Sequence, residues 1–267
     1  MSKNTEKSKA VASKILEYLE RKRLDGSLAH YYVEQPTATA LKLDNPYCLP
    51  EKEFARKVHA ILIVGGDGAF LDAEMRFPGI PKLEINTGNV GFLAQIDEKF
   101  EHALDRFFEG KYRIEKRSKL QCRVGARKIE ALNDVHVYAK KPSRPFNVRV
   151  FSQTFDEIFY ANGIIFSTAT GSTAHSFSVG GPVISPQVDA ILMTPVAALN
   201  PLLHPVVFSS KEKLTLEVIE RQALFSADGF FEDPVESMEV SLSPQKANLI
   251  LLGKDEFWKK LRRKLFY

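Results

Sequence analysis

The pattern of apolar and polar positions changes near residue 112 and predicts two regions of different fold. Before that point, segments with apolar residues at helical spacing alternate with short apolar runs, which is typical of an α/β arrangement. After it, short strand-like runs follow one another with turn residues between them, which indicates β-rich structure. We see no internal repeat and no low-complexity tract.

In the first region, the longest helical pattern begins near the start of the chain. Val11, Ile15 and Leu19 recur there at helical spacing, and a later segment places Phe100 and Leu104 on one face before Gly110 ends it. The pattern predicts helices at Lys7–Arg23, Glu51–His59 and Lys99–Gly110, and strands at His30–Glu34, Ile61–Val64 and Lys82–Asn86.

The second region predicts a series of strands and then one amphipathic, basic helix at Glu256–Phe266. The expected strands are Leu120–Val124, Glu130–Leu132, Val135–Tyr138, Val148–Phe151, Glu157–Tyr160, Ile164–Ser167, Lys213–Val218, Ala223–Ser226, Glu236–Leu242 and Asn248–Leu252.

Composition narrows the class of protein. With 267 residues and 44% hydrophobic residues, the chain can bury a sizeable core. Two distant cysteines, Cys48 and Cys122, argue against a disulfide framework and fit a reducing compartment. No apolar stretch approaches the roughly 20 residues that span a bilayer, and the lysine-rich start lacks the apolar core of a signal peptide. We therefore expect a cytoplasmic protein without a membrane partner.

The net charge of +4 is mild, and much of the excess lies in basic runs near the two ends. We interpret these runs as solvated helix faces rather than as a nucleic-acid site, because no aromatic RNA-binding motif or zinc-finger spacing accompanies them.

The most informative motif is the turn Gly65-Gly66-Asp67-Gly68, which follows the Ile61–Val64 strand directly. A strand, a glycine-rich turn and a helix together aim amide groups at phosphate. Asp67 would repel phosphate, so we expect it to take a proton from a substrate or to hold a cation. The alternative is a Gly-Asp-Gly turn that only links two elements.

A second motif runs from Ser167 to Ser178 and ends at Gly180-Gly181-Pro182. Five of its first seven residues are Ser or Thr, which would offer hydrogen bonds to a polar ligand. Alternatively, Ser172 or Thr173 simply caps a following helix. Two further polar segments, Asn133-Asp134 and Asn86–Gly91, can likewise be plain turns.

Taken in order, these segments resemble the NAD kinase family over most of the chain. The residues that carry the resemblance are Gly65–Gly68, Asn86–Gly88 with Gly91–Leu93, Asn133-Asp134, Ser167-Thr168 with Thr170–Ala174, and Gly180–Pro182. The resemblance implies a Rossmann-like α/β domain over residues 1–112 and a β-rich, β-sandwich-like NAD-binding domain over residues 113–253, with the active site between them. The helix at 254–267 would pack back on the first domain.

The resemblance also implies an activity. The chain would be a phosphotransferase that moves a phosphoryl group from ATP, or from polyphosphate, to the 2′-hydroxyl of the adenosine ribose of NAD, giving NADP. Mg²⁺ or another divalent cation would lie on the nucleotide phosphates, with no protein metal ligand assigned. Family members are usually dimers or tetramers, so a homodimer or homotetramer is expected.

The same resemblance implies roles for individual residues. Asp67 would be the catalytic base, and Gly65, Gly66 and Gly68 would hold the triphosphate. Phe92, Asn133, Thr173 and Ala174 would line the adenine pocket, Asp134 would bind a ribose hydroxyl, and Ser178 would lie near the nicotinamide. The remaining residues expected to bind NAD are Asn86, Asn162, Thr170, Ser172, His175 and Asp228.

The chain departs from the usual family pattern at several positions. Asn162 stands where a carboxylate is usual, His175 where a Tyr is usual, and His204 where an Arg is usual; Ala69 and Ala169 replace a Thr and a Pro. Asn162, His175 and His204 favour an alternative, a non-catalytic NAD(P)-binding sensor on the same fold, whereas the intact Gly-Gly-Asp-Gly turn disfavours it. A lipid kinase shares that turn, but Asn133-Asp134 and the Thr170–Ala174 segment argue against it. The sequence leaves open the phosphoryl donor, NADH acceptance, and control by NADPH.

Overall fold

The computed structural model describes residues 6–43, 47–88, 91–94, 96, 100–141, 143–200, 204–254 and 256–266. The chain forms two compact units: residues 1–116 together with 248–267, and residues 117–247. This division differs from the expected limits at 112 and 253, because two strands close to those limits belong to the sheet of the first unit.

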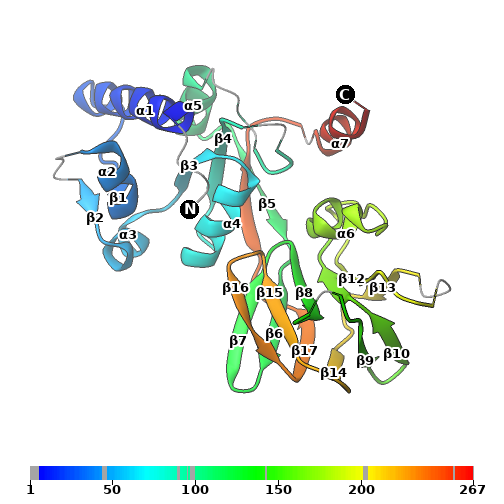
Figure 1. The fold of residues 1–267 in the computed structure, drawn as a ribbon. Helices are drawn as coiled ribbons and strands as arrows, with labels where there is room; N and C mark the ends of the chain where they lie inside the picture. The colour runs from blue at the N-terminus through cyan, green and yellow to red at the C-terminus, as the bar shows by residue number, and fades with distance from the viewer. Residues whose placement is uncertain are drawn as a thin grey trace. The chain divides into compact units, whose positions relative to one another are not determined.

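A four-stranded sheet is the centre of the first unit, in the order β3-β4-β18-β5 (Figure 1). Its strands are β3 (Ile61–Gly65), β4 (Lys82–Asn86), β18 (Ala247–Leu251) and β5 (Arg113–Arg117). The strand β4 runs parallel to both β3 and β18. Almost every residue of β4 and β18 is buried, as parallel strands covered on both faces require.

The helices of this unit begin and end close to the predicted positions. Helix α1 (Glu6–Leu24) and helix α5 (Glu101–Phe108) bury their apolar residues with Leu83 and Ile85 of β4 in one core. The other helices are α2 (Gln35–Leu41), α3 (Glu51–Lys57), α4 (Asp67–Arg76) and α7 (Phe257–Phe266). The short strands β1 (Val33–Glu34) and β2 (Cys48–Leu49) pair with each other in parallel.

The second unit is a sandwich of two six-stranded antiparallel sheets around one apolar core. The first sheet has the order β10-β9-β14-β17-β6-β7, and the second has the order β13-β12-β11-β8-β15-β16. The strands of the first sheet are β6 (Leu120–Val124), β7 (Arg127–Ala131), β9 (Phe146–Phe151), β10 (Asp156–Ala161), β14 (Leu214–Val218) and β17 (Ser237–Leu242). Those of the second are β8 (Asp134–Ala139), β11 (Gly163–Ser167), β12 (Ala190–Val196), β13 (Val206–Ser209), β15 (Ala223–Ala227) and β16 (Phe231–Val235).

A short helical segment lies outside the two sheets. It consists of a 3₁₀ turn, η1 (Gly171–Thr173), and the one-turn helix α6 (His175–Ser178). The hydroxyls of Ser176 on α6 and Thr194 on β12 lie 2.7 Å apart, so α6 is held against the second sheet.

Candidate functional site

The glycine turn begins where β3 ends, and Asp67 is the first residue of α4. A β-carbon at Gly66 or at Gly68 would meet no atom within 4 Å, and neither residue has a positive φ. Neither packing nor backbone conformation therefore requires glycine at these two positions, although a glycine within a helix costs about 1 kcal/mol relative to alanine. The open space above the turn leaves room for a ligand to approach the backbone.

Both oxygens of the Asp67 carboxylate accept hydrogen bonds from backbone amides. The Phe92 N–H donates to Oδ2 and the Leu93 N–H donates to Oδ1, each at 3.0 Å. Each carboxylate oxygen has a second acceptor site, so the group can still receive a proton or a cation. The contact brings together Asp67 and Phe92, two residues that the sequence places in separate motifs.

Helix α7 holds the same loop from the other side. Lys260 Nζ donates to the carbonyl oxygens of Phe92 and Ala94 at 3.3 and 2.5 Å. The Phe92 ring packs against Phe257 at a centroid distance of 5.7 Å, and Lys264 Nζ lies 4.5 Å from the Phe92 centroid. Phe92, expected in the adenine pocket, therefore contacts the C-terminal helix within the first unit.

Two other polar side chains of β4 complete this region. Asn86 Oδ1 accepts the Gly88 N–H at 3.0 Å, which is an Asx turn at the end of the strand. Glu84 is 1% exposed, and its carboxylate oxygens have no hydrogen-bond partner. Burial, and then the charge of Asp67, raises the pKa of Glu84 well above its usual value. Sequence reasoning missed Glu84, whose only signal was an acidic residue inside an apolar strand.

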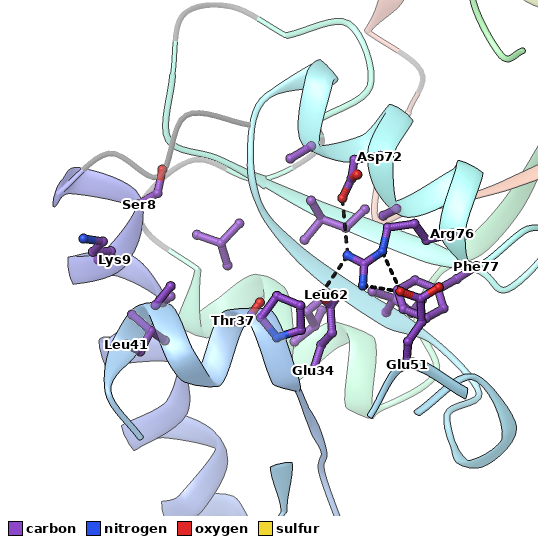
Figure 2. Close-up of a pocket in the computed structure, with 18 residues that line it drawn as sticks. Ser8, Lys9, Glu34, Thr37, Leu41, Glu51, Leu62, Asp72, Arg76 and Phe77 are labelled. Carbon is purple, nitrogen blue, oxygen red and sulfur yellow. Dashed lines mark hydrogen bonds and ion pairs between the residues drawn. The ribbon is translucent and has the colours of Figure 1, made fainter. Parts of the chain in front are cut away.

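The first unit also contains a cavity of about 580 Å³ beside β3, lined by residues of α1, α2 and α4 (Figure 2). Inside it, the Arg76 guanidinium contacts Glu34 at 2.7 Å, Glu51 at 2.8 Å and Asp72 at 3.5 Å. Its other cation, Lys9, pairs with Glu6. Since carboxylates already surround Arg76, this cavity does not suit a polyphosphate chain.

In the second unit, Asp228 fixes the Asn133-Asp134 segment. Its carboxylate accepts the backbone N–H groups of Leu132 at 2.6 Å, Asn133 at 2.8 Å and Asp134 at 3.0 Å. Asp228 itself has a positive φ of 48°. Asp228, which we expected to bind NAD, thus holds the backbone of the neighbouring loop in place. Within the part of the chain that the structure describes, the side-chain amide of Asn133 makes no hydrogen bond.

Burial is the main influence on the protonation of Asp134 and Asp228. Asp134 is 9% exposed, and burial, followed by the charge of Asp228, raises its pKa to about 7. Burial raises the pKa of Asp228 to about 6, even though the three amide donors act to lower it. Asp134 therefore changes charge near neutral pH, where a hydroxyl ligand could pair with it.

The hydroxyl-rich segment is held mainly by hydrogen bonds within the protein. Thr168 Oγ1 donates to the Leu132 carbonyl at 2.6 Å, and Ser172 Oγ donates to the Ala169 carbonyl at 2.7 Å. Thr173 Oγ1 donates to the Thr170 carbonyl at 3.3 Å. The idea that Ser172 or Thr173 caps a helix is wrong, because α6 begins after Ala174 and no side chain caps it.

The other residues expected to bind NAD lie at different depths in the second unit. Thr170 is buried, Ala174 is half-buried, and His175 and Ser178 are exposed on α6. Oδ1 of Asn162 is buried and has no hydrogen-bond partner. The His175 ring meets His136 edge-on at a centroid distance of 4.8 Å. His136 was missed, because a single histidine in a strand gives no sequence signal.

Across the described ranges, no three His, Cys, Asp or Glu side chains gather in a way that could hold a metal ion. None of the helices in those ranges combines the length and the apolar character needed to cross a membrane.

Comparison with known proteins matches both units to one family. A family model of the ATP-NAD kinase N-terminal domain matches residues 3–112, and a model of the ATP-NAD kinase C-terminal domain matches residues 132–252. An NAD kinase from Methanothermobacter thermautotrophicus is 34% identical over 216 residues, which cover 77% of this chain and 75% of the relative.

Two solved structures are similar to this one and confirm the expected fold class. Yeast NADH kinase complexed with NADH has a TM-score of 0.84 at 20% identity, over 97% of this chain and 83% of that chain. An NAD kinase from Archaeoglobus fulgidus in complex with ATP has a TM-score of 0.72 at 25% identity, over 91% of this chain and 93% of that chain. With both family models matched, the chain belongs to the NAD kinase family of phosphotransferases.

Proposed function

We propose that the protein transfers a phosphoryl group from ATP to the 2′-hydroxyl of the adenosine ribose of NAD and so produces NADP. The observation that carries the proposal is the turn at the end of β3, where Gly66 and Gly68 have no reason in the fold to be glycine and Asp67 lies between them. An open glycine backbone beside one carboxylate suits a phosphate chain next to an acidic group that accepts a proton.

In this proposal Asp67 is the general base. The proton of the ribose hydroxyl moves to the carboxylate, the ribose oxygen bonds to the transferred phosphorus, and ADP leaves. The amides of Phe92 and Leu93 hold the carboxylate in place during this step. A divalent cation, with Mg²⁺ expected, would neutralise charge on the ATP phosphates. Mg²⁺ usually keeps several waters and binds through substrate phosphates, so it needs few protein ligands.

Most of the proposed NAD contacts belong to the second unit. Asn133, whose backbone is fixed by Asp228, presents its side-chain amide to adenine, and Asp134 binds a ribose hydroxyl. Thr173 and Ala174 are further proposed adenine contacts from this unit. Asn86, Asn162, Thr170, Ser172, His175 and Ser178 supply the remaining proposed contacts, with Ser178 near the nicotinamide.

The test is incubation of the purified protein with NAD, Mg²⁺ and ATP, followed by an NADP-specific enzymatic assay. NADP formation that stops on chelation with EDTA and in the Asp67→Asn variant supports the proposal. Parallel reactions with inorganic polyphosphate and with NADH determine donor and acceptor range. Binding of NAD without any NADP formation would instead indicate a nucleotide sensor, for which Asn162 and His175 are the features to test first.

The resemblance to the family also leads us to propose a homodimer or homotetramer in the cytoplasm. Sedimentation of the native protein tests the assembly, since a monomer at micromolar concentration would contradict it.

A further inference from the structure

Several polar residues of β8 and β11 lie together on one face of the second sheet in the second unit, whereas the other face belongs to the apolar core. Val135 and Val137 of β8 point into the apolar core, so the alternating residues Asp134, His136 and Tyr138 share the opposite face. Ser167 of β11 pairs with Asp134 across the antiparallel ladder and lies on that same face. We call Asp134, His136, Tyr138 and Ser167 the polar face.

The polar face contains buried groups that the protein leaves unsatisfied. Nε2 of His136 and Oγ of Ser167 are buried and have no hydrogen-bond partner among the described residues. The same holds for Oδ1 of Asn162, the residue before β11. Each such atom costs about 1–3 kcal/mol of desolvation that no hydrogen bond recovers. Groups of this kind persist in native proteins where a ligand or function requires them.

The sequence makes room for the His136 ring. A β-carbon at Gly163 would overlap Nε2 of His136, so the imidazole lies over this glycine, next to Asn162. The exposed ring of His175 on α6 covers another side of the His136 ring. His136 is therefore held in a defined position, two residues after Asp134 on β8 and against Gly163 of β11.

The charges around His136 favour a neutral ligand group over a phosphate. Strands β8, β11, β12 and β15 contain no Lys or Arg, whereas Asp134 lies on the polar face and Glu232 of β16 hydrogen-bonds Tyr138. Burial, and then the charge of His175, lowers the pKa of His136 to about 4. At neutral pH the imidazole therefore offers one donor and one acceptor, which suit a hydroxyl, an amide or a base edge.

We propose that His136 is a substrate-binding residue, whose neutral imidazole hydrogen-bonds the uncharged nucleoside part of the dinucleotide. The inference rests on the proposed function for the identity of the dinucleotide, NAD. It adds a contact that neither the glycine turn nor the Asn133-Asp134 segment supplies.

Two substitutions separate ligand binding from a structural role. His136→Leu removes the unpaired nitrogen and keeps an apolar side chain of similar bulk, while His136→Gln keeps a neutral hydrogen-bonding group near the position of Nε2. An exposed histidine in the first unit provides the matched control, His102→Leu. Calorimetric titration measures NAD affinity at pH 7.5 without ATP, and thermal unfolding without ligand measures stability.

We expect His136→Leu to weaken NAD binding about tenfold or more, while its unfolding temperature without ligand stays equal or rises, because an unsatisfied buried group has been removed. His136→Gln should stay within about threefold of the parent affinity, and tripolyphosphate binding should not change in either variant. Unchanged NAD affinity in His136→Leu would overturn the inference, as would equal losses for NAD and tripolyphosphate, or a fall in stability alone. These experiments measure binding and not turnover. A protein that binds NAD but forms no NADP would therefore contradict the proposed reaction without contradicting this inference.

Discussion

Asp67 and Gly91 lie so close together that a β-carbon at residue 91 would be 2.8 Å from Oδ1 of the Asp67 carboxylate. The amides that follow Gly91, at Phe92 and Leu93, are the donors that hold this carboxylate. The position of Asp67 thus requires glycine at residue 91, and the loop at residues 91–93 supports the carboxylate of the glycine turn.

The first prediction concerns this contact. Gly91→Ala should push the Asp67 carboxylate away from the loop and lower kcat by roughly 100-fold, because a misplacement of about 1 Å at a reacting group has an effect of that size. Steady-state assays of NADP formation measure the change. Gly253→Ala is the control, since a β-carbon there meets no atom within 4 Å. Equal activity of the two variants would contradict the prediction.

Asp67 itself should be needed for transfer but not for NAD binding. Loss of a general base typically lowers the rate by about 10²–10⁴, so we expect Asp67→Asn to lose turnover by this factor while its NAD dissociation constant stays close to that of the parent. Because the asparagine would present an amide group to the Phe92 or Leu93 N–H, circular dichroism must first show that the variant is folded. Near-full turnover by a folded variant would remove Asp67 from the mechanism.

Asn133→Ala should weaken NAD binding by about 1–3 kcal/mol, the usual cost of leaving a buried polar partner unpaired. Its backbone contacts to Asp228 and Thr168 stay available in the variant, so stability should change little. Calorimetry with NAD and with ATP measures both affinities. Equal weakening of both nucleotides would mean that the adenine pocket is assigned wrongly.

Asp228→Ala should destabilise the second unit and also abolish NAD binding, because three backbone amides lose one shared carboxylate. Hydrogen bonds to a charged group contribute about 1.5–3 kcal/mol each, so a loss of several kcal/mol is expected. The control is Asp233→Ala, which removes only an exposed ion pair with Arg127. Chemical denaturation measures the free energy of unfolding of both variants. Similar values would show that Asp228 does not hold the Asn133-Asp134 segment in place.

The free energy of unfolding should depend on pH through the protonation of His136. Burial, followed by the charge of His175, lowers the pKa of His136 from 6.5 to about 4. Between pH 6.5 and about pH 4, therefore, this histidine is protonated in the unfolded chain but neutral in the folded chain. The contribution of neutral, buried His136 to the free energy of unfolding is fully present above pH 6.5, and it declines as the pH falls from 6.5 to about 4. Asp134 acts in the opposite direction, because its raised pKa of about 7 favours the folded state on acidification.

The difference between the parent protein and His136→Gln isolates the histidine. From pH 7.5 to pH 5 the parent should lose about 2 kcal/mol of unfolding free energy relative to the variant. Urea denaturation at the two pH values measures this difference. Parallel pH profiles would show that His136 is not held neutral by its surroundings.

Local patterns in the sequence predicted much of the fold. The apolar run at Ile61–Val64 and the helical spacing of Val11, Ile15 and Leu19 gave β3 and α1 within one or two residues. The sequence did not predict helix α2, because its sequence signals are limited to Pro36 in its first turn and a few small residues. Its short length leaves little apolar periodicity to detect.

The sequence predicted some residues of the site but not the contacts that hold them in place, and the reason is physical. Asp67 and Asn133 stand in short motifs that a single segment reveals, whereas their partners come from distant segments. The amides of Phe92 and Leu93, the carboxylate of Asp228 and the ring of His136 act only after the chain has folded, so no local pattern could show their roles.

The place of β18 has a consequence for how the chain folds during synthesis. In the sheet of the first unit, β18 lies between β4 and β5, yet it is synthesised after all the described strands of the second unit. Residues 117–247 emerge as one uninterrupted stretch and can collapse while translation continues. Residues 1–116 cannot complete their sheet until β18 has been synthesised, so the first unit, which begins earlier in the chain, is completed after the second.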